Sequence, residues 1–247
     1  MTEPSALVSD ELLEQLSGVS NATVLSCLLA RGYRSVQMEG VKPLAPGRRL
    51  CARAVTLRSL PARPDLKERI ASGARGDGMN DTPRWQALEA LGPGDALVTD
   101  AMRLGDVSTG GDVVYSRIVT RGAAGLVTDG AVRDSAAVIA FGFPLYAGGA
   151  TSTVGEEEIL PYQVNVPIQC GGVLVWPGDV VMGDGDGVVV LPSQLAAEIL
   201  PEGVEHDETE TAILEHTQRE GVSPGAFYPF NDDTRRLYED WKAARGR

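Results

Sequence analysis

The sequence predicts a mixed α/β fold built as a single compact domain, and three observations carry this prediction. Residues 124–127 form a short apolar run typical of a buried strand, which ends at the turn-forming pair Asp129-Gly130. Apolar runs and helix-like segments alternate through the middle of the chain, which is the pattern of parallel strand–helix units. A chain of 247 residues is long enough to bury one full core.

The N-terminal part is expected to contain helices at its start and a first strand soon after. Ser20 offers a helix N-cap inside the first helical segment, so that segment is one helix or two. Residues 59–82 are polar and rich in Gly and Pro, which predicts a long loop beside the site or a partly disordered one. The elements expected here are a helical region 10–31, a strand 49–57, a helix 85–91 and a strand 96–99.

The middle and the C-terminal part follow two different patterns. Parallel units are expected up to about residue 147, and then short β-rich runs predict an antiparallel meander. We expect a domain over residues 1–200 and a charged, partly helical extension over 201–247. The expected elements are a loop 108–112, a helix 113–120, a strand 125–128, a helix 135–141, a strand 144–147, strands 173–176, 179–182 and 187–191, and a helix that starts near 194.

Composition excludes several classes of function. A net charge of −12 argues against direct nucleic-acid binding, because phosphate binding needs a concentrated positive patch. The apolar runs are too short to span a membrane, and the N-terminal residues lack the pattern of a signal peptide, so we expect a cytoplasmic protein without membrane contact. Three widely spaced cysteines predict free thiols. Both histidines lie in the acidic C-terminal stretch, which argues against a histidine-based triad or zinc site.

Arg133 and Asp134 are the first candidates for chemistry, because they follow just after the expected strand 125–128, where α/β folds place their sites. Arginine offers a planar fork of donors for a carboxylate or an α-keto acid. A neighbouring aspartate suits a divalent cation such as Mg²⁺, with water filling most of its coordination shell. The alternative is a surface ion pair, or a cap for the helix that starts at Ser135.

Asp112 is the second candidate, at the expected start of a helix. The free amides of Val113 and Val114 could bind an anion there, and the alternative is an ordinary helix cap. Two glycine-rich segments are not expected to bind a ligand. Residues 183–187 (GDGDG) predict a tight hairpin turn rather than a calcium loop, and residues 73–78 (GARGDG) lack the setting of a nucleotide-binding motif.

The order of these segments resembles the RraA-like family over residues 20–192. That family includes the class II 4-hydroxy-4-methyl-2-oxoglutarate/4-carboxy-4-hydroxy-2-oxoadipate aldolases and the ribonuclease activity regulator RraA-like proteins. The motifs that carry the resemblance are GGDVV (110–114), RGAAGLVTDGAVRDS (121–135) and IQCGGVLVWPGDVVMGDGDGVVVLP (168–192). The resemblance implies a fold of the phosphohistidine-domain type, assembled as a homotrimer or homohexamer with sites between subunits.

The resemblance also assigns roles to individual residues. It implies that Asp134 holds the metal, Mg²⁺ or Mn²⁺, and that Arg133 contacts the pyruvate moiety of the substrate. Asp112 would lie near the waters of the metal, and the amides from Gly111 to Val114 would hold the carboxylate of pyruvate. The family's regulator lacks the metal-binding aspartate, which this chain keeps. One departure is that the segment GGATSTVG (148–155) lacks a basic residue often seen there.

These features lead to a main hypothesis and two alternatives. The main one is a divalent-metal-dependent lyase that cleaves 4-hydroxy-2-oxo acids or oxaloacetate to pyruvate through an enolate stabilised by the metal and Arg133. No lysine lies near the motif to form a Schiff base, which favours the metal route. The alternatives are a non-catalytic regulator that binds an RNA-degrading enzyme, and a lyase or hydratase acting on a sugar-derived keto acid.

Overall fold

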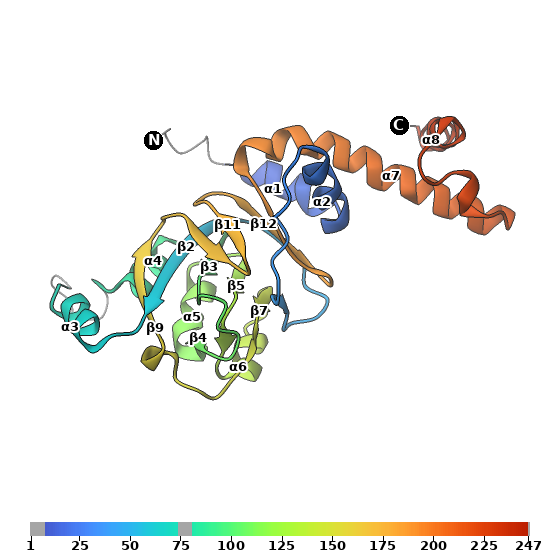
Figure 1. The fold of residues 1–247 in the computed structure, drawn as a ribbon. Helices are drawn as coiled ribbons and strands as arrows, with labels where there is room; N and C mark the ends of the chain where they lie inside the picture. Colours follow the sequence, from blue (N-terminus) through green and yellow to red (C-terminus); the bar gives the residue numbers. More distant parts are fainter. Residues whose placement is uncertain (1–7, 74–80, 247) are drawn as a thin grey trace.

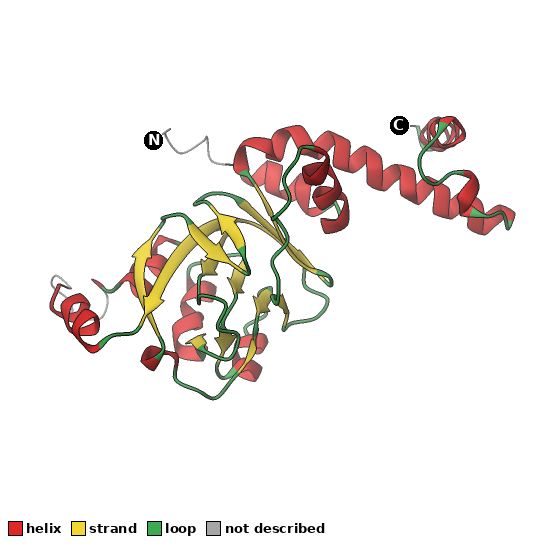
Figure 2. Ribbon diagram, viewed as in Figure 1, coloured by secondary structure: helices red, strands yellow, loops and turns green. Residues whose placement is uncertain are grey.

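The computed structural model describes residues 8–73 and 81–246, and a large mixed sheet forms its centre (Figure 2). Its neighbouring strands, in spatial order, are β1 (Lys42–Pro43), β7 (Leu145–Ala147), β5 (Gly125–Thr128), β3 (Asp95–Thr99), β2 (Leu50–Pro61), β12 (Val180–Asp184) and β13 (Gly187–Leu191). The strands β7, β5, β3 and β2 run parallel to one another, as the sequence predicts. β1, β12 and β13 pair antiparallel, and so does β9 (Ile159–Val164), which joins the second half of β2.

Helices enclose this sheet in two groups. The helices α4 (Pro83–Ala90), α5 (Asp112–Thr120) and α6 (Ser135–Ala140) contribute Leu88, Ile118 and Val138 to a core that also contains Leu126 of β5. The helices α1 (Asp10–Ser17), α2 (Asn21–Ala30) and the first part of α7 (Ala196–Glu220) pack against β12 and β13. Ser20 caps α2 by accepting a hydrogen bond from the amide of Thr23, so the N-terminal helical region is two helices.

A second, smaller sheet follows the carboxyl ends of three parallel strands. β3 leads to β4 (Ser108–Gly110), β5 leads to β6 (Ala131–Val132), and β7 leads to β8 (Gly149–Ala150). These three short strands pair in parallel in the order β4-β6-β8. The sequence predicts a loop at 108–112, and this prediction is wrong for β4, because pairing with β6 gives these small residues extended structure.

The prediction of a long loop over residues 59–82 is also wrong in part. Residues 59–61 continue β2, since Leu60 pairs with Leu160 of β9. They are followed by the helix α3 (Pro64–Gly73). Residues 74–80 of the expected loop, which include most of the segment GARGDG, lie outside the described residues.

The antiparallel C-terminal region is divided between two sheets. β12 and β13 form a hairpin of the main sheet around Gly185-Asp186, as predicted for the GDGDG segment. β11 (Val173–Val175) pairs instead with β10 (Ile168–Cys170) in a two-stranded sheet that covers the core beside β2 and β12. All three cysteines are free thiols, as expected.

The chain ends in two helices that extend away from the sheet (Figure 1). α7 is continuous across residue 200, and its far end leads through a short 3₁₀ turn, η4 (Pro224–Ala226), to α8 (Asp232–Ala244). α8 packs on α7. In the part of the chain that the structure describes, no helix combines the length and the apolar character needed to cross a bilayer.

Candidate active site

The start of α5, the start of α6 and the segment after β8 together line an open, shallow cavity of about 670 Å³. The helix starts bring Asp112 and Asp134 to the same cavity, although 22 positions separate them in sequence. Its lining residues are Asp112, Asp134, Ser135, Ala136, Ala137, Ala150, Thr151 and Ser152. The small second sheet places these segments together, because β4 precedes α5 and β6 precedes α6.

Asp134 is held over Gly111 in an unusual backbone conformation. It has a φ of 50° and a ψ of 37°, in the left-handed region that most residues avoid. A Cβ atom at Gly111 would lie 2.5 Å from Oδ2 of Asp134, so only glycine leaves room for this carboxylate. The carboxylate does not cap α6 and has no hydrogen bond or ion pair with another described residue. Neither alternative considered for this aspartate, a cap or an ion pair with Arg133, is therefore observed.

Arg133 lies beside the cavity rather than among its lining residues. Its backbone amide donates a hydrogen bond to the carbonyl of Gly110 (2.9 Å), which fixes the main chain between the two small strands. The side chain is half-buried, and its guanidinium has no bonding partner among the described residues. The five donors of this guanidinium therefore stay available to a ligand.

Asp112 is the first residue of α5, and Gly111 occupies the N-cap position. Oδ1 of Asp112 accepts a hydrogen bond from the amide of Val113 (2.7 Å), so one of the predicted anion-binding amides is engaged by this carboxylate. The amide of Val114 lies in the same first turn, where no carbonyl of the helix can accept from it. Asp112 thus accepts from one amide of the helix start, that of Val113.

The donor set fits a hard cation that keeps most of its water. Among the residues that the structure describes, no group of three or more His, Cys, Asp or Glu side chains could hold a metal ion. Two carboxylates, Asp134 and Asp112, nevertheless line one cavity, and that of Asp134 is unpartnered. Mg²⁺ is commonly bound by one or two carboxylates with waters completing its shell, so the fit is to a hydrated ion and not to a protein cage.

A buried carboxylate pair that sequence reasoning missed fixes the carboxyl edge of the main sheet. Asp129, expected only as a turn residue, accepts hydrogen bonds from the amides of Ala101 (2.6 Å) and Gly171 (3.0 Å). Gln169 bridges it to Asp100 by donating to both carboxylates. Burial raises the pKa of Asp100, and the neighbouring charge of Asp129 acts in the same direction. The signal in the sequence was weak, because the donors come from distant segments.

The sequence also did not predict the contacts that hold β4 against α5 and against the chain after β8. The hydroxyls of Thr109 and Tyr115 are 2.7 Å apart and tie β4 to α5, and burial raises the pKa of Tyr115 to about 12. A Cβ atom at Gly155 would lie 1.7 Å from the carbonyl oxygen of Ser108, so the chain after β8 can approach β4 only through glycine. At Gly110 a Cβ atom would lie 2.9 Å from the ring of Tyr115, so this position of β4 is also closely packed.

Comparison with known proteins agrees with this architecture. A family model described as Aldolase/RraA matches residues 6–190. The chain belongs to the Aldolase/RraA family. Streptomyces coelicolor RraAS2, described as an unusual member of the RNase ES inhibitor RraA protein family, superposes with a TM-score of 0.74 at 32% identity, covering 84% of this chain and 98% of that one. An uncharacterized protein from Pseudomonas syringae pv. tomato has the same fold, with a TM-score of 0.74 at 23% identity over 90% of this chain and 98% of that chain.

Curated relatives in this Aldolase/RraA family match over shorter stretches. A Halalkalibacterium halodurans protein inferred to be a 4-hydroxy-4-methyl-2-oxoglutarate aldolase is 41% identical over 107 residues, which is 43% of this chain and 50% of that protein. A Shewanella oneidensis protein of the same inferred activity is 31% identical over 110 residues, 44% of this chain and 66% of that protein. The matches therefore span about half to two thirds of these relatives.

Proposed function

We propose that this protein is a divalent-metal-dependent lyase that cleaves 4-hydroxy-2-oxo acids or oxaloacetate to pyruvate. The observation that carries the proposal is the unpartnered carboxylate of Asp134, held over Gly111 in a cavity that Asp112 also lines. Its left-handed backbone and its close approach to Gly111 hold this exposed carboxylate at the cavity, where it remains available to a ligand. The relatives inferred to be aldolases support the same reaction class.

Substrate binding would use the donors around Asp134. The keto-acid end carries a carboxylate, which suits the positive end of α5 and the amide of Val114. The free guanidinium of Arg133 lies next to this position and would pair with the keto-acid end as charge develops on it. Ser135 and Thr151 add hydroxyls to the lining of the cavity, and they would be available to the distal part of the substrate.

Asp134, with Asp112 nearby, would hold Mg²⁺ or Mn²⁺, which supplies a Lewis acid for the keto oxygen and the carboxylate of the substrate. In retro-aldol cleavage the C3–C4 bond breaks, its electron pair stays on the pyruvate part, and the 4-hydroxyl loses its proton. The freed C3 then gains a proton. Asp112 would hold the water that carries these protons, because neither histidine lies near the cavity. With oxaloacetate the same bond cleavage releases carbon dioxide.

Exposed apolar side chains beside the cavity indicate how subunits would assemble. Val113, next to Asp112, is 75% exposed, and Val154, two residues beyond Ser152, is 52% exposed. Apolar side chains beside a wide polar cavity suit burial by a second subunit. We therefore propose that the site lies at an interface of a homotrimer or homohexamer, where a neighbour would add the donors that a single chain lacks.

Two further functions have specific support. The similarity to Streptomyces coelicolor RraAS2 favours a non-catalytic regulator that binds an RNA-degrading enzyme. The cavity itself would also accept a sugar-derived keto acid in a lyase or hydratase, since its hydroxyl groups suit a polar distal half. The retained Asp134 favours an enzyme over the regulator.

The experiment that tests the proposal is pyruvate release from 4-hydroxy-4-methyl-2-oxoglutarate and from oxaloacetate, with Mg²⁺ and with EDTA. Wild type should turn over only with metal, and Asp134→Ala should lose this activity while its far-ultraviolet dichroism stays unchanged. Asp186→Ala, at the exposed tip of the β12–β13 hairpin, is the matched control and should keep full activity. Full activity of Asp134→Ala would refute the role of this residue. No turnover by wild type on either compound would refute the proposed substrates.

A further inference from the structure

A second polar cavity, of about 300 Å³, is lined by residues other than those of the candidate active site. It lies between α2, the segment that leads to β1, the loop after β3 and the turn between β10 and β11. Arg34 and Arg103 both line it, although the net charge of the whole chain is −12. A cavity that gathers two cations in an acidic protein indicates a site for an anion.

Arg103 belongs to a loop whose backbone has an uncommon conformation. Met102 and Arg103 have φ values of 57° and 61°, in the left-handed region that residues other than glycine rarely adopt. The two buried carboxylates beside the loop fix this conformation. The amide of Met102 donates to Oδ1 of Asp100 (2.7 Å), and the amide of Arg103 donates to Oδ2 of Asp129 (3.0 Å). Backbone held in this way is common at ligand sites, and here it sets where Arg103 leaves the main chain.

The turn between β10 and β11 leaves room for the guanidinium of Arg103. Gly172 has a φ of 77°, and a Cβ atom there would lie 3.0 Å from Nη1 of Arg103. The neighbouring carbonyl of Gly171 accepts from the amide of Glu39 (2.8 Å), which ties the turn to the segment before β1. Nη2 of Arg103 pairs with Oε2 of Glu39 at 2.6 Å. Glu39 therefore orients this guanidinium, while Nη1 has no hydrogen bond with another described residue.

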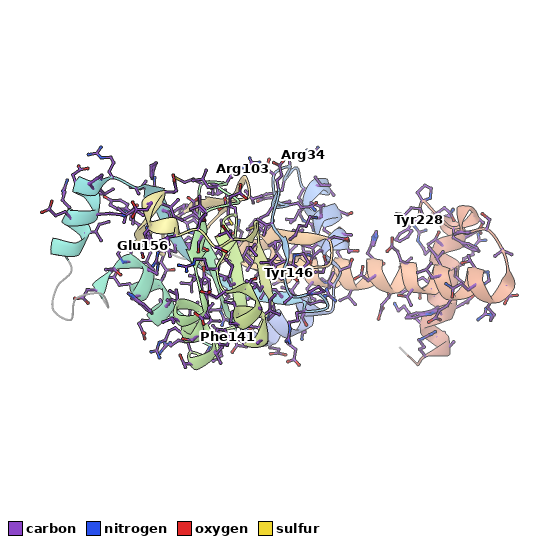
Figure 3. The ribbon with its side chains drawn as sticks, turned by 90° about the horizontal axis from the view of Figure 1, so that it is seen from below. Arg34, Arg103, Phe141, Tyr146, Glu156 and Tyr228 are labelled. Carbon is purple, nitrogen blue, oxygen red and sulfur yellow. The ribbon has the colours of Figure 1, made fainter. Side chains whose placement is uncertain are left out.

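Arg34 reaches the same cavity from the segment that follows α2. The carbonyl of Val36 accepts a hydrogen bond from the amide of Val190 (2.8 Å), which fixes this segment against β13. Arg34 is exposed, and its guanidinium has no hydrogen bond or ion pair with another described residue. Figure 3 shows Arg34 and Arg103 at the same edge of the molecule. Donors from two arginines are therefore available to one ligand.

This donor set suits a phosphate group better than a carboxylate. One guanidinium fork can engage both oxygens of a carboxylate, whereas a phosphate monoester offers three oxygens to forks from two directions. Ser35 and Gln37 add a hydroxyl and an amide to the lining of the cavity. Leu25 and Leu29 of α2 add apolar surface, which suits a carbon chain. A volume of about 300 Å³ is at the small end of ligand pockets, so the ligand is a small one.

We propose that this cavity binds a small phosphate monoester, with its phosphate between Arg34 and Arg103 and its carbon chain against Leu25 and Leu29. The site is independent of the proposed lyase activity, because its residues are not those that line the active-site cavity. Binding therefore needs no divalent metal. The buried pair of Asp100 and Asp129, which the proposed reaction does not use, serves this site by holding the loop of Arg103.

Titration calorimetry with propyl phosphate, in EDTA and at low ionic strength, tests the proposal. Wild type should bind one propyl phosphate per chain. Arg34→Gln and Arg103→Gln should each weaken binding by about tenfold or more, because each removes charge-assisted hydrogen bonds. Both side chains are exposed, so the variants should stay folded, which circular dichroism checks. Absence of binding to wild type, or equal affinity of wild type and both variants, would overturn the proposal.

Matched variants show whether the cavity itself holds the phosphate. Arg219→Gln, at the far end of α7, removes the same charge from an exposed side chain and should keep the wild-type affinity. Arg133→Gln should also keep it, although the proposed reaction places an anion beside Arg133. Loss of binding in Arg133→Gln, with Arg34→Gln and Arg103→Gln unchanged, would assign the phosphate to the active-site cavity and overturn the proposal.

Two further ligands test the chemical class. Butyrate carries the same three-carbon chain as propyl phosphate with a carboxylate in place of the phosphate, and it should bind about tenfold more weakly or worse. Butyrate binding as tightly as propyl phosphate would overturn the assignment to a phosphate monoester. Inorganic phosphate lacks the carbon chain and should bind more weakly than propyl phosphate. Equal affinity for these two would contradict the contact with Leu25 and Leu29.

Discussion

Gly111→Ala is a sharp test of the site because it adds one methyl group beside the carboxylate of Asp134. The added Cβ would lie 2.5 Å from Oδ2 of Asp134, whereas an ordinary contact begins near 3.4 Å, so the carboxylate must move by about 0.9 Å. The backbone of Gly111, at φ −128° and ψ −165°, is extended and accepts alanine without strain. The displacement therefore falls on an exposed side chain and not on the fold.

The expected loss of activity follows from this displacement. A misplacement of about 1 Å at a reacting centre lowers the rate by about 100-fold, which corresponds to about 2.7 kcal/mol of transition-state stabilisation. We expect kcat/KM for pyruvate release to fall by about that factor and the Mg²⁺ concentration for half-maximal activity to rise. The free energy of unfolding should change by no more than about 1 kcal/mol, because Asp134 is exposed and makes no bond that the change would break.

A matched control separates this effect from that of a general Gly-to-Ala change. Gly185→Ala, in the β12–β13 hairpin, adds a Cβ atom with no heavy atom within 4 Å and should leave both activity and stability unchanged. The measurements are pyruvate release over a Mg²⁺ titration and urea unfolding of each variant. Wild-type kcat/KM for Gly111→Ala across that titration would refute the reasoning that Gly111 sets the position of the Asp134 carboxylate.

Two further predictions concern stability. Burial raises the pKa of Asp100 above its ordinary 3.8, so the folded protein binds that proton more tightly than the unfolded chain does and loses stability as the pH rises from 3.8 to the raised pKa, with no further loss above it. Asp100→Asn should remove this loss, so the free energy of unfolding of the variant, measured in urea at several pH values, should rise relative to that of wild type over this pH range. A difference between the two free energies that stays constant with pH would contradict the prediction. Gly155→Ala should lower the free energy of unfolding by at least about 2 kcal/mol, because its Cβ would overlap backbone at Ser108. An unchanged melting temperature would contradict that prediction.

The parts of the fold that local sequence determines were predictable. The apolar run before Asp129 predicts β5, and the family resemblance implied that Asp112 lies near the metal held by Asp134. Residues 59–61 were not predictable as strand, since their partner β9 lies about 100 positions further along the chain. The strands β6 and β8 have two residues each, too few to show a period.

The site shows the same limit. Arg133 and Asp134 could be found because a charged pair directly after an apolar strand is a local signal. The buried role of Asp129 could not, because its donors at Ala101 and Gly171 approach only in the folded chain. The contact between Gly111 and Asp134 was equally hidden, since no local pattern distinguishes a glycine that makes room for a side chain from one that makes a turn.

The succession of β3 to β4, β5 to β6 and β7 to β8 has a consequence for how this protein can diverge. The large apolar residues of the main sheet are buried in one layer, whereas the side chains around the cavity project from short segments beyond it. Replacements at Ala136, Ala150 or Ser152 would reshape the cavity without opening the core. Under the proposed function, single substitutions at these three positions would change substrate preference with little effect on thermal stability, which makes them targets for redirecting specificity.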